Sequence, residues 1–314
     1  MRKPLKITLT LIGAIVAVPA LALGTTAIVN AVATKSELQA IEPYGELVPV
    51  AGKHMNVVDT GSGDETVVLL PGLGTAAPAL DFQPLITELR ATHRVIAVEP
   101  FGTGLSDQTD TPRTAANIAE EVHEALQQLD VDRYVLMGHS IAGIYALEYS
   151  ARYPAELVAF VGIDSSVPGQ PGSTDGVPTD GLATLNRLGI LRVLSALSGD
   201  LYAGTPFDDE TKQQMSLLST RNATAPTILD EMKRAPENFA ALRNAAFPAA
   251  LPVLLFVATD DTDVPGWIEL HDRQAETVDH GETRLFTGGH YLHHTQSPAI
   301  AAETTAFLTA LPAG

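Results

Sequence analysis

The residues best placed to do chemistry form the hexapeptide GHSIAG at 138–143, which centres on Ser140. An apolar run at 134–137 precedes it and a helical pattern at 144–152 follows, so Ser140 is expected on a sharp turn from strand to helix. Such a turn strains the backbone and exposes the hydroxyl. The helix behind it would direct unpaired N–H groups and the positive end of its dipole toward a developing oxyanion. The hexapeptide therefore predicts a nucleophilic serine.

A serine hydroxyl is a weak nucleophile until a histidine takes its proton and a carboxylate orients that histidine. Downstream, the apolar run 251–258 is typical of a buried parallel strand, and the loop 259–265 after it holds three aspartates. A short strand at 283–286 leads to a Gly-Gly-His sequence ending at His290, followed by an amphipathic helix at 297–311. The three side-chain types needed therefore follow one another along the chain.

With these motifs in this order, the chain resembles a serine hydrolase of the α/β-hydrolase superfamily, in its esterase-like branch. The resemblance implies Ser140 as nucleophile and His290 as base. It also implies Asp261 as the acid, because the family's acid commonly stands four residues before a proline, here Pro265.

Two other acids remain alternatives to Asp261. Asp260 differs from it by one position in the same loop, and Asp164 directly follows a predicted strand at 157–163. Asp263 is interpreted as a solvated loop carboxylate.

The same resemblance places an oxyanion hole. The strand pattern 67–70 runs into a Gly-rich loop at 71–75, and by position the backbone N–H of Leu73 joins that of Ile141 as the second donor. The chain has Pro71 where the family often has His, and Ala142 where the common turn has Gly, but neither difference removes a donor. Glu99, at the end of the strand pattern 95–99, is interpreted as structural.

The expected fold class is α/β: a mostly parallel central sheet flanked by helices, the α/β-hydrolase fold. Short apolar runs alternate with helical patterns over 36–164 and 251–314, which we predict to form the core. Over 165–250 the alternation stops, and helical patterns occur at 182–197, 208–219 and 236–246. An insertion of this size between late strands resembles the helical cap of many members of the superfamily, so a helical cap is expected at 165–250. A stripe of leucines in the first of these helices is expected mainly to pack on the core.

The N-terminal residues 1–35 are predicted to be a membrane anchor or signal segment. Three cations, Arg2, Lys3 and Lys6, precede an uncharged stretch that is long enough as a helix to cross a bilayer. Small-residue cleavage patterns at 20–22 and 31–33 keep a secreted product as the alternative, but a signal's apolar region is usually shorter. The cations favour a single pass through the cell membrane with the catalytic domain outside the cytoplasm.

Composition excludes several partners. With the three N-terminal cations set aside, 16 basic residues remain against 37 acidic ones, a net charge of −21, which disfavours nucleic acid. The chain has no cysteine, so it has neither disulfides nor thiolate chemistry.

No cofactor is expected. No metal is expected either. His290, His293 and His294 lie close in sequence, but their pattern lacks the glutamate of zinc proteases. His293 and His294 are interpreted as polar rim residues, and His139 as a structural neighbour of the serine.

These observations predict an extracytoplasmic serine esterase acting on a small ester with an apolar portion, through a Ser-His-Asp triad and an acyl-enzyme. Amide or N-terminal-proline cleavage by the same triad is the first alternative. A non-catalytic binding module with the same fold is the second. The sequence does not set the oligomeric state.

Overall fold

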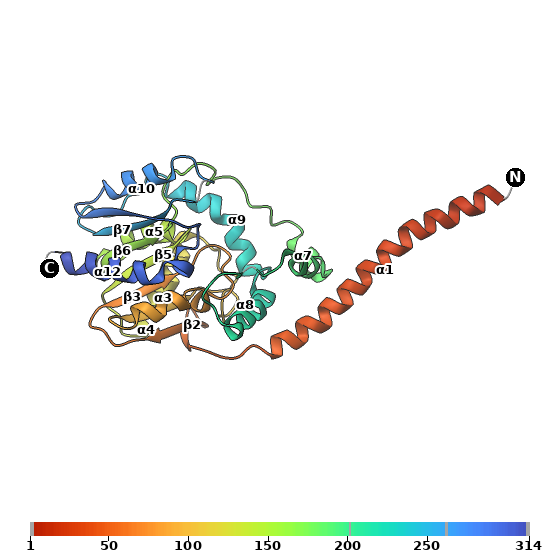
Figure 1. The fold of residues 1–314 in the computed structure, drawn as a ribbon, viewed down its shortest axis with the longest axis horizontal. Coiled ribbons are helices and arrows are strands. Elements are labelled where there is room, and N and C mark those ends of the chain that lie inside the picture. Colours follow the sequence, from red (N-terminus) through yellow and green to blue (C-terminus); the bar gives the residue numbers. More distant parts are fainter. Residues whose placement is uncertain (1–2, 201, 261–262, 312–314) are drawn as a thin grey trace.

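Within the residues that the structure describes, one eight-stranded sheet forms the centre of the molecule (Figure 1). The computed structural model describes residues 3–200, 202–260 and 263–311. Along the sheet the strands follow the order β1-β2-β4-β3-β5-β6-β7-β8, and β2 is antiparallel to both of its neighbours while the strands from β4 to β8 are parallel. The strands are β1 (Glu46–Val50), β2 (Lys53–Thr60), β3 (Thr66–Leu70), β4 (Arg94–Glu99), β5 (Tyr134–His139), β6 (Leu157–Ile163), β7 (Val253–Ala258) and β8 (Gly281–Phe286).

Helices cover both faces of this sheet, because the central strands are apolar on both sides. On one face, the side chains of Leu136 and Leu255 pack with α4, α5 and α10; on the other, those of Val135 and Leu254 pack with α3 and α12. The flanking helices are α2 (Pro78–Asp81), α3 (Gln83–Leu89), α4 (Ala115–Gln128), α5 (Ala142–Arg152), α10 (Trp267–Ala275), α11 (Leu292–Thr295) and α12 (Ser297–Ala310). The predicted α/β architecture is confirmed.

In the described residues between β6 and β7 there are four helices: α6 (Leu182–Arg187), α7 (Ile190–Ser198), α8 (Asp209–Asn222) and α9 (Pro226–Ala241). The predicted helix at 182–197 is divided at Gly189, whose φ of +74° begins a new helix. The helix expected from 236 begins instead at Pro226, and Pro236 lies inside it. We call α6 to α9 the helical segment.

The leucine stripe of the helical segment does not pack as expected. Neither α6 nor α7 contains a buried residue, and Leu194 and Leu197 are 53% and 79% exposed. The expectation that most of these leucines face the core is therefore wrong, because α6 and α7 lie beside the N-terminal helix at the edge of the molecule (Figure 1).

The N-terminal helix α1 (Lys3–Gln39) extends well beyond the rest of the molecule (Figure 1). Its described part from Ala17 to Gln39 is long and apolar enough to cross a membrane, as both a membrane anchor and a signal sequence would be. Only the part of α1 toward its C-terminal end lies beside α7 and α8.

Candidate active site

Ser140 lies on the predicted turn between β5 and α5. Its φ of +55° is the strained, left-handed conformation that this turn requires. The surrounding chain fixes this conformation, because the Ser140 N–H donates to the carbonyl of Ile163 and the Ser140 carbonyl accepts from Gly143 and Ser166 at 3.0 and 2.7 Å. The side chain is half-buried at the carboxyl edge of the sheet.

Small residues allow neighbouring segments to approach this turn. A Cβ atom at Gly138 would lie 2.9 Å from the Ala142 Cβ, and one at Gly143 would lie 2.4 Å from the Ser166 carbonyl oxygen. Both contacts are too short for real Cβ atoms, so strand and helix can pass only with glycine at these positions. Ala142 is tolerated because Gly138 opposite it has no side chain.

The loop after β3 lies against Ser140. A Cβ atom at Gly72 would lie 3.0 Å from the Ser140 Cβ and 2.8 Å from the His139 Nδ1. This contact places the Leu73 backbone beside the start of α5, where Ile141 is the first residue after the serine. Among the turn and loop hydrogen bonds of the described residues, neither the Leu73 nor the Ile141 amide donates to another backbone group. The two predicted oxyanion donors therefore lie on adjoining segments.

His290 is held by Asp164, the residue after β6. The His290 Nδ1 lies 2.6 Å from the Asp164 Oδ2, and the carboxylate is fully buried while the imidazole remains 34% exposed. His290 and Ser140 line one open pocket of about 480 Å³. A serine, a histidine and a carboxylate from the segments that follow β5, β8 and β6 thus lie around one pocket or in contact with its lining.

The Asp164 carboxylate has fixed hydrogen-bond donors on both oxygens. Oδ1 accepts from the Trp267 Nε1 at 2.7 Å and from the Ala258 backbone N–H at 2.9 Å, which leaves Oδ2 for His290. Burial alone would raise the pKa of Asp164, but the hydrogen bonds from His290, Trp267 and Ala258 outweigh it and hold the pKa below its ordinary value. The group is therefore an anion at neutral pH, as a residue that orients a histidine must be.

The predicted acid, Asp261, lies outside the described residues, so its assignment stays a prediction. Asp260 and Asp263 are exposed and line the same pocket as Ser140 and His290. From the sequence Asp164 is only an alternative acid, because its one signal is that it follows a predicted buried strand. This local pattern does not reveal the parallel pairing of β6 with β7, which places Asp164 near His290.

Glu99 has the structural role predicted for it. The carboxylate is fully buried at the end of β4 and accepts hydrogen bonds from the Tyr44 hydroxyl, the Asn56 side chain and the backbone N–H groups of Ala79 and Leu105. Burial raises the pKa of Glu99 despite these donors. The Glu99 carboxylate thereby joins β2, through Asn56, to the segments that contain Tyr44, Ala79 and Leu105.

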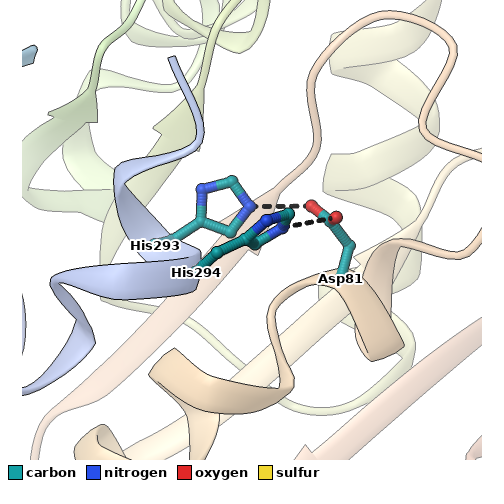
Figure 2. Close-up of side chains that lie close together, drawn as sticks. All are labelled: Asp81, His293 and His294. Carbon is teal, nitrogen blue, oxygen red and sulfur yellow. Dashed lines mark hydrogen bonds and ion pairs between the residues drawn. The ribbon is translucent and has the colours of Figure 1, made fainter. Parts of the chain in front are cut away.

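A second histidine pair holds the segment that carries His290. His293 and His294, from α11, both direct their Nε2 atoms at the Asp81 carboxylate of α2, at 2.7 and 2.8 Å (Figure 2). All three side chains are buried, so the interpretation of His293 and His294 as rim residues is wrong. The physical reason is that α11 turns inward onto α2, which follows the oxyanion loop. We call this trio the Asp81 clamp.

The Asp81 clamp also has the composition of a metal site, with three potential ligand atoms within 4.8 Å of one another. Each imidazole Nε2, however, is already at hydrogen-bond distance from a carboxylate oxygen (Figure 2). The His293 Nδ1 is buried without a hydrogen-bond partner among the described residues, whereas a metal-bound histidine normally donates its second N–H. The geometry therefore fits hydrogen bonding better than metal ligation.

His139 links the clamp to the catalytic loop. Burial, with the charges of His293 and His290, lowers its pKa well below the ordinary value, so the ring is neutral. The His139 Nε2 can then donate to the His290 carbonyl oxygen at 3.0 Å, and the ring lies 4.6 Å from that of His293 between centroids. His139, the neighbour of Ser140, thus supports the backbone of His290.

Comparison with known proteins adds the following similarities. Residues 67–304 match the sequence model of a family described as "Alpha/beta hydrolase family". Protein YbdG of Bacillus subtilis, described as uncharacterized, is 27% identical over 233 residues, 72% of each chain. A putative carbamate hydrolase, RutD, of Yersinia enterocolitica is 28% identical over 242 residues, 74% of this chain and 83% of the relative. Among solved structures, a thermophilic esterase from Thermogutta terrifontis has a TM-score of 0.65 at 20% identity, covering 85% of this chain and 98% of its own.

Proposed function

The chain belongs to the alpha/beta hydrolase family, which confirms the predicted fold, and within that family we propose that it is a serine hydrolase of carboxylic esters. The observation that carries the proposal is the 2.6 Å contact between the His290 Nδ1 and the Asp164 Oδ2, at a pocket that Ser140 also lines. The contact with Asp164 orients the His290 imidazole, and in the proposal its Nε2 acts on the serine.

In the proposed mechanism the His290 Nε2 removes the Ser140 proton as the Ser140 Oγ attacks the ester carbonyl. The buried Asp164 anion stabilises the imidazolium that forms. The Leu73 and Ile141 amides donate to the oxyanion, and His290 returns its proton to the departing alcohol. A water molecule activated by His290 then hydrolyses the acyl-enzyme and restores the serine.

The lining of the site supports a substrate without negative charge. Asp260 and Asp263 line the pocket with Ser140 and His290, and none of its described lining residues is a lysine or arginine. Two carboxylates would repel an anionic substrate. This argues against a dicarboxylate such as the one in the name of an Escherichia coli relative, a 2-hydroxy-6-oxononadienedioate/2-hydroxy-6-oxononatrienedioate hydrolase, which is 30% identical over 149 residues, 45% of this chain and 50% of the relative.

A second cavity supports an ester with an apolar portion. It has a volume of about 350 Å³, and its lining includes Leu73, whose amide is a proposed oxyanion donor, with Ala77 and Met215. The polar side chains of Tyr202, Asp81 and His294 line it as well. Met215 belongs to α8, so the helical segment forms part of the wall, as expected of a cap. We expect this cavity to hold a short or medium acyl chain.

We further propose that α1 is an uncleaved anchor that holds the catalytic domain outside the cytoplasm. Hydrogen bonds join α1 to the helical segment, among them Thr26 Oγ1 to the Leu188 carbonyl and Asn30 Nδ2 to the Asn186 carbonyl, both at 2.8 Å. Cleavage after Ala33 would remove both contacts, which supports retention of the helix.

Hydrolysis of nitrophenyl esters of increasing acyl length by the purified full-length protein tests the proposed function. We expect turnover of short and medium chains, abolished by Ser140→Ala and unaffected by Ser62→Ala, which changes an exposed serine. An inactive wild-type protein with a normal melting curve would contradict the proposal. Better turnover of long-chain emulsions would contradict the size preference.

Amide cleavage is a second candidate, because Asp260 and Asp263 could bind the ammonium group of a free N-terminus. Nitroanilides of proline, assayed beside the esters, separate the two activities. A larger kcat/KM for the nitroanilide would favour the peptidase.

A further inference from the structure

Helix α1 docks on the helical segment through a polar stripe. Thr26 and Asn30, one turn apart, donate to the carbonyls of Leu188 and Asn186. Gly189 lies at the same place, and a Cβ atom there would be 2.5 Å from the Thr26 carbonyl oxygen. The backbones of α1 and of the α6–α7 turn therefore lie in direct contact.

Arg192, on α7, extends this contact toward the end of α1. Its guanidinium donates to both carboxylate oxygens of Glu37, at 2.6 and 2.7 Å, and to the Asn30 Oδ1 at 2.9 Å. A bidentate pair of this kind fixes geometry as well as contributing energy. Helix α7 thus has a fixed position relative to α1.

That position coincides with one end of a membrane span. The uncharged run of α1 begins after Lys6. A span of ~30 Å needs about 20 helical residues, so a span that starts directly after Lys6 ends near Thr26, where the docking stripe begins. If α1 spans the bilayer as proposed above, α7 lies at the outer membrane interface.

The free face of α7 suits that interface. Val193, Leu194 and Leu197 are 45%, 53% and 79% exposed. At about 100° per residue, Leu194 and Leu197 project to the side of α7 opposite Arg192, and Val193 lies at the border of that side. Residues 181–199 contain two arginines and no acid, in a chain of net charge −18. Helix α7 has apolar residues on one side and a single cation, Arg192, which pairs with Glu37, on the other. An amphipathic helix with an exposed apolar face of this kind can lie in a membrane surface.

We propose that α7 inserts its face of Val193, Leu194 and Leu197 into the outer leaflet of the membrane that α1 crosses. The inference rests on the anchor role proposed for α1. Because α7 belongs to the helical segment, its insertion would seat that segment, and with it one wall of the apolar cavity, on the lipid surface (Figure 1).

The absence of cysteine permits a direct test by site-specific labelling. The full-length protein is reconstituted in phosphatidylcholine and phosphatidylglycerol nanodiscs, with an environment-sensitive fluorophore on Leu197→Cys. Matched variants are Leu285→Cys, which is 54% exposed on β8 at the sheet edge, and Val18→Cys, which is 66% exposed on α1. Quenching by spin-labelled phosphatidylcholine is measured for each, and melting curves establish that each variant is folded.

We expect the quenching constant at position 197 to exceed that at position 285 by roughly threefold or more, and that at position 18 to be large. Strong quenching at 18 with equal values at 197 and 285 would overturn the insertion of α7 and leave the anchor intact. Weak quenching at both 18 and 197 would overturn the anchor and the insertion together. Crosslinking of Leu197→Cys into dimers without lipid quenching would assign the face to a second copy of the chain and contradict the proposal.

Discussion

At the scale of residues, the proposed catalysis depends on which carboxylate orients His290. Asp164 accepts hydrogen bonds on both oxygens and keeps its negative charge, whereas the exposed Asp260 has more freedom. A catalytic acid gains from such fixed donors, since they hold one oxygen ready for the histidine.

Asparagine at position 164 would keep the shape of the side chain and lose its charge. We expect Asp164→Asn to lower kcat by about 10⁴-fold, because the histidine would adopt the wrong tautomer, with little change in KM. The measurement is steady-state ester hydrolysis, with Asp260→Asn and Asp261→Asn as parallel variants. A larger loss of kcat in Asp261→Asn than in Asp164→Asn would identify Asp261, in the loop after β7, as the acid that orients His290.

Gly72 provides a second test at this scale, because its Cα faces the serine turn. Gly72→Ala would place a methyl group against the Ser140 Cβ and the His139 ring, and we expect it to displace the oxyanion loop and reduce kcat by 10²-fold or more, roughly the effect of one lost oxyanion donor. Gly176→Ala is the matched control, since nothing lies within 4 Å of that position. Equal activity of the two variants would show that the loop does not need this close approach.

The sequence was informative about the local structure at Ser140 and His290, because each has local neighbours of defined type. Ser140 lies between glycines that the close packing of β5 and α5 requires, and His290 follows a Gly-Gly turn. The position of Asp164 against His290 depends on the pairing of β6 with β7, which involves residues about 90 positions apart and leaves no local pattern.

At the scale of elements, the Asp81 clamp joins the two loops that carry the proposed catalytic groups. Helix α2 follows the oxyanion loop and α11 follows His290, so the hydrogen bonds to His293 and His294 fix one loop against the other (Figure 2). The clamp positions catalytic residues without contacting the substrate carbonyl in the proposed mechanism.

We expect Asp81→Asn to lower kcat and to reduce the free energy of unfolding by ~1–3 kcal/mol at neutral pH, since one buried imidazole loses a charged acceptor. Burial opposes ionisation of Asp81, but the charges and hydrogen bonds of His293 and His294 outweigh it and lower its pKa. Because the pKa of Asp81 is lowered in the folded protein, its ionised carboxylate stabilises the fold at pH values above the ordinary pKa of 3.8. This stabilisation is lost as the pH falls through the folded-state pKa of Asp81.

Urea unfolding, from neutral pH to a pH below 3.8, measures the free energy of unfolding of wild type and Asp81→Asn. The difference in stability between wild type and Asp81→Asn should be largest at neutral pH and should shrink under acidic conditions. Asp64→Asn, at an exposed site, is the control. A difference in the free energy of unfolding that does not change with pH would contradict an ionised Asp81 in the clamp.

The strands at the centre of the sheet were predictable and some edge elements were not. Buried parallel strands such as β5 and β7 are continuous apolar runs. The β1–β2 hairpin contains exposed polar residues and turns at Ala51 and Gly52, so its pattern is weak. The start of α9 was misplaced because Pro236 looks like a first helical residue, whereas Pro226 has that position.

At the scale of the whole molecule, α1 both extends outward and braces the helical segment (Figure 1). The polar residues that interrupt its apolar run, Thr26 and Asn30, are explained by contacts with α6 and α7. Sequence alone could not assign these roles, since the partners lie more than 150 positions away.

Two truncations separate these functions of α1. Deletion of residues 2–25 removes the proposed span and keeps the docking stripe, so we expect a protein released from membranes by carbonate, with the melting temperature of the full chain. Deletion of 2–39 also removes the partners of Arg192 and should lower the melting temperature. Release of the full-length protein by carbonate would contradict the anchor.

The central claim is that Ser140, activated by His290, forms a covalent intermediate, and peptide mapping after reaction with a fluorophosphonate tests it most directly. We predict one adduct, on Ser140, formed much more slowly in His290→Ala. Labelling of a different serine, or no labelling of the folded protein under conditions that modify a control serine hydrolase, would contradict the account.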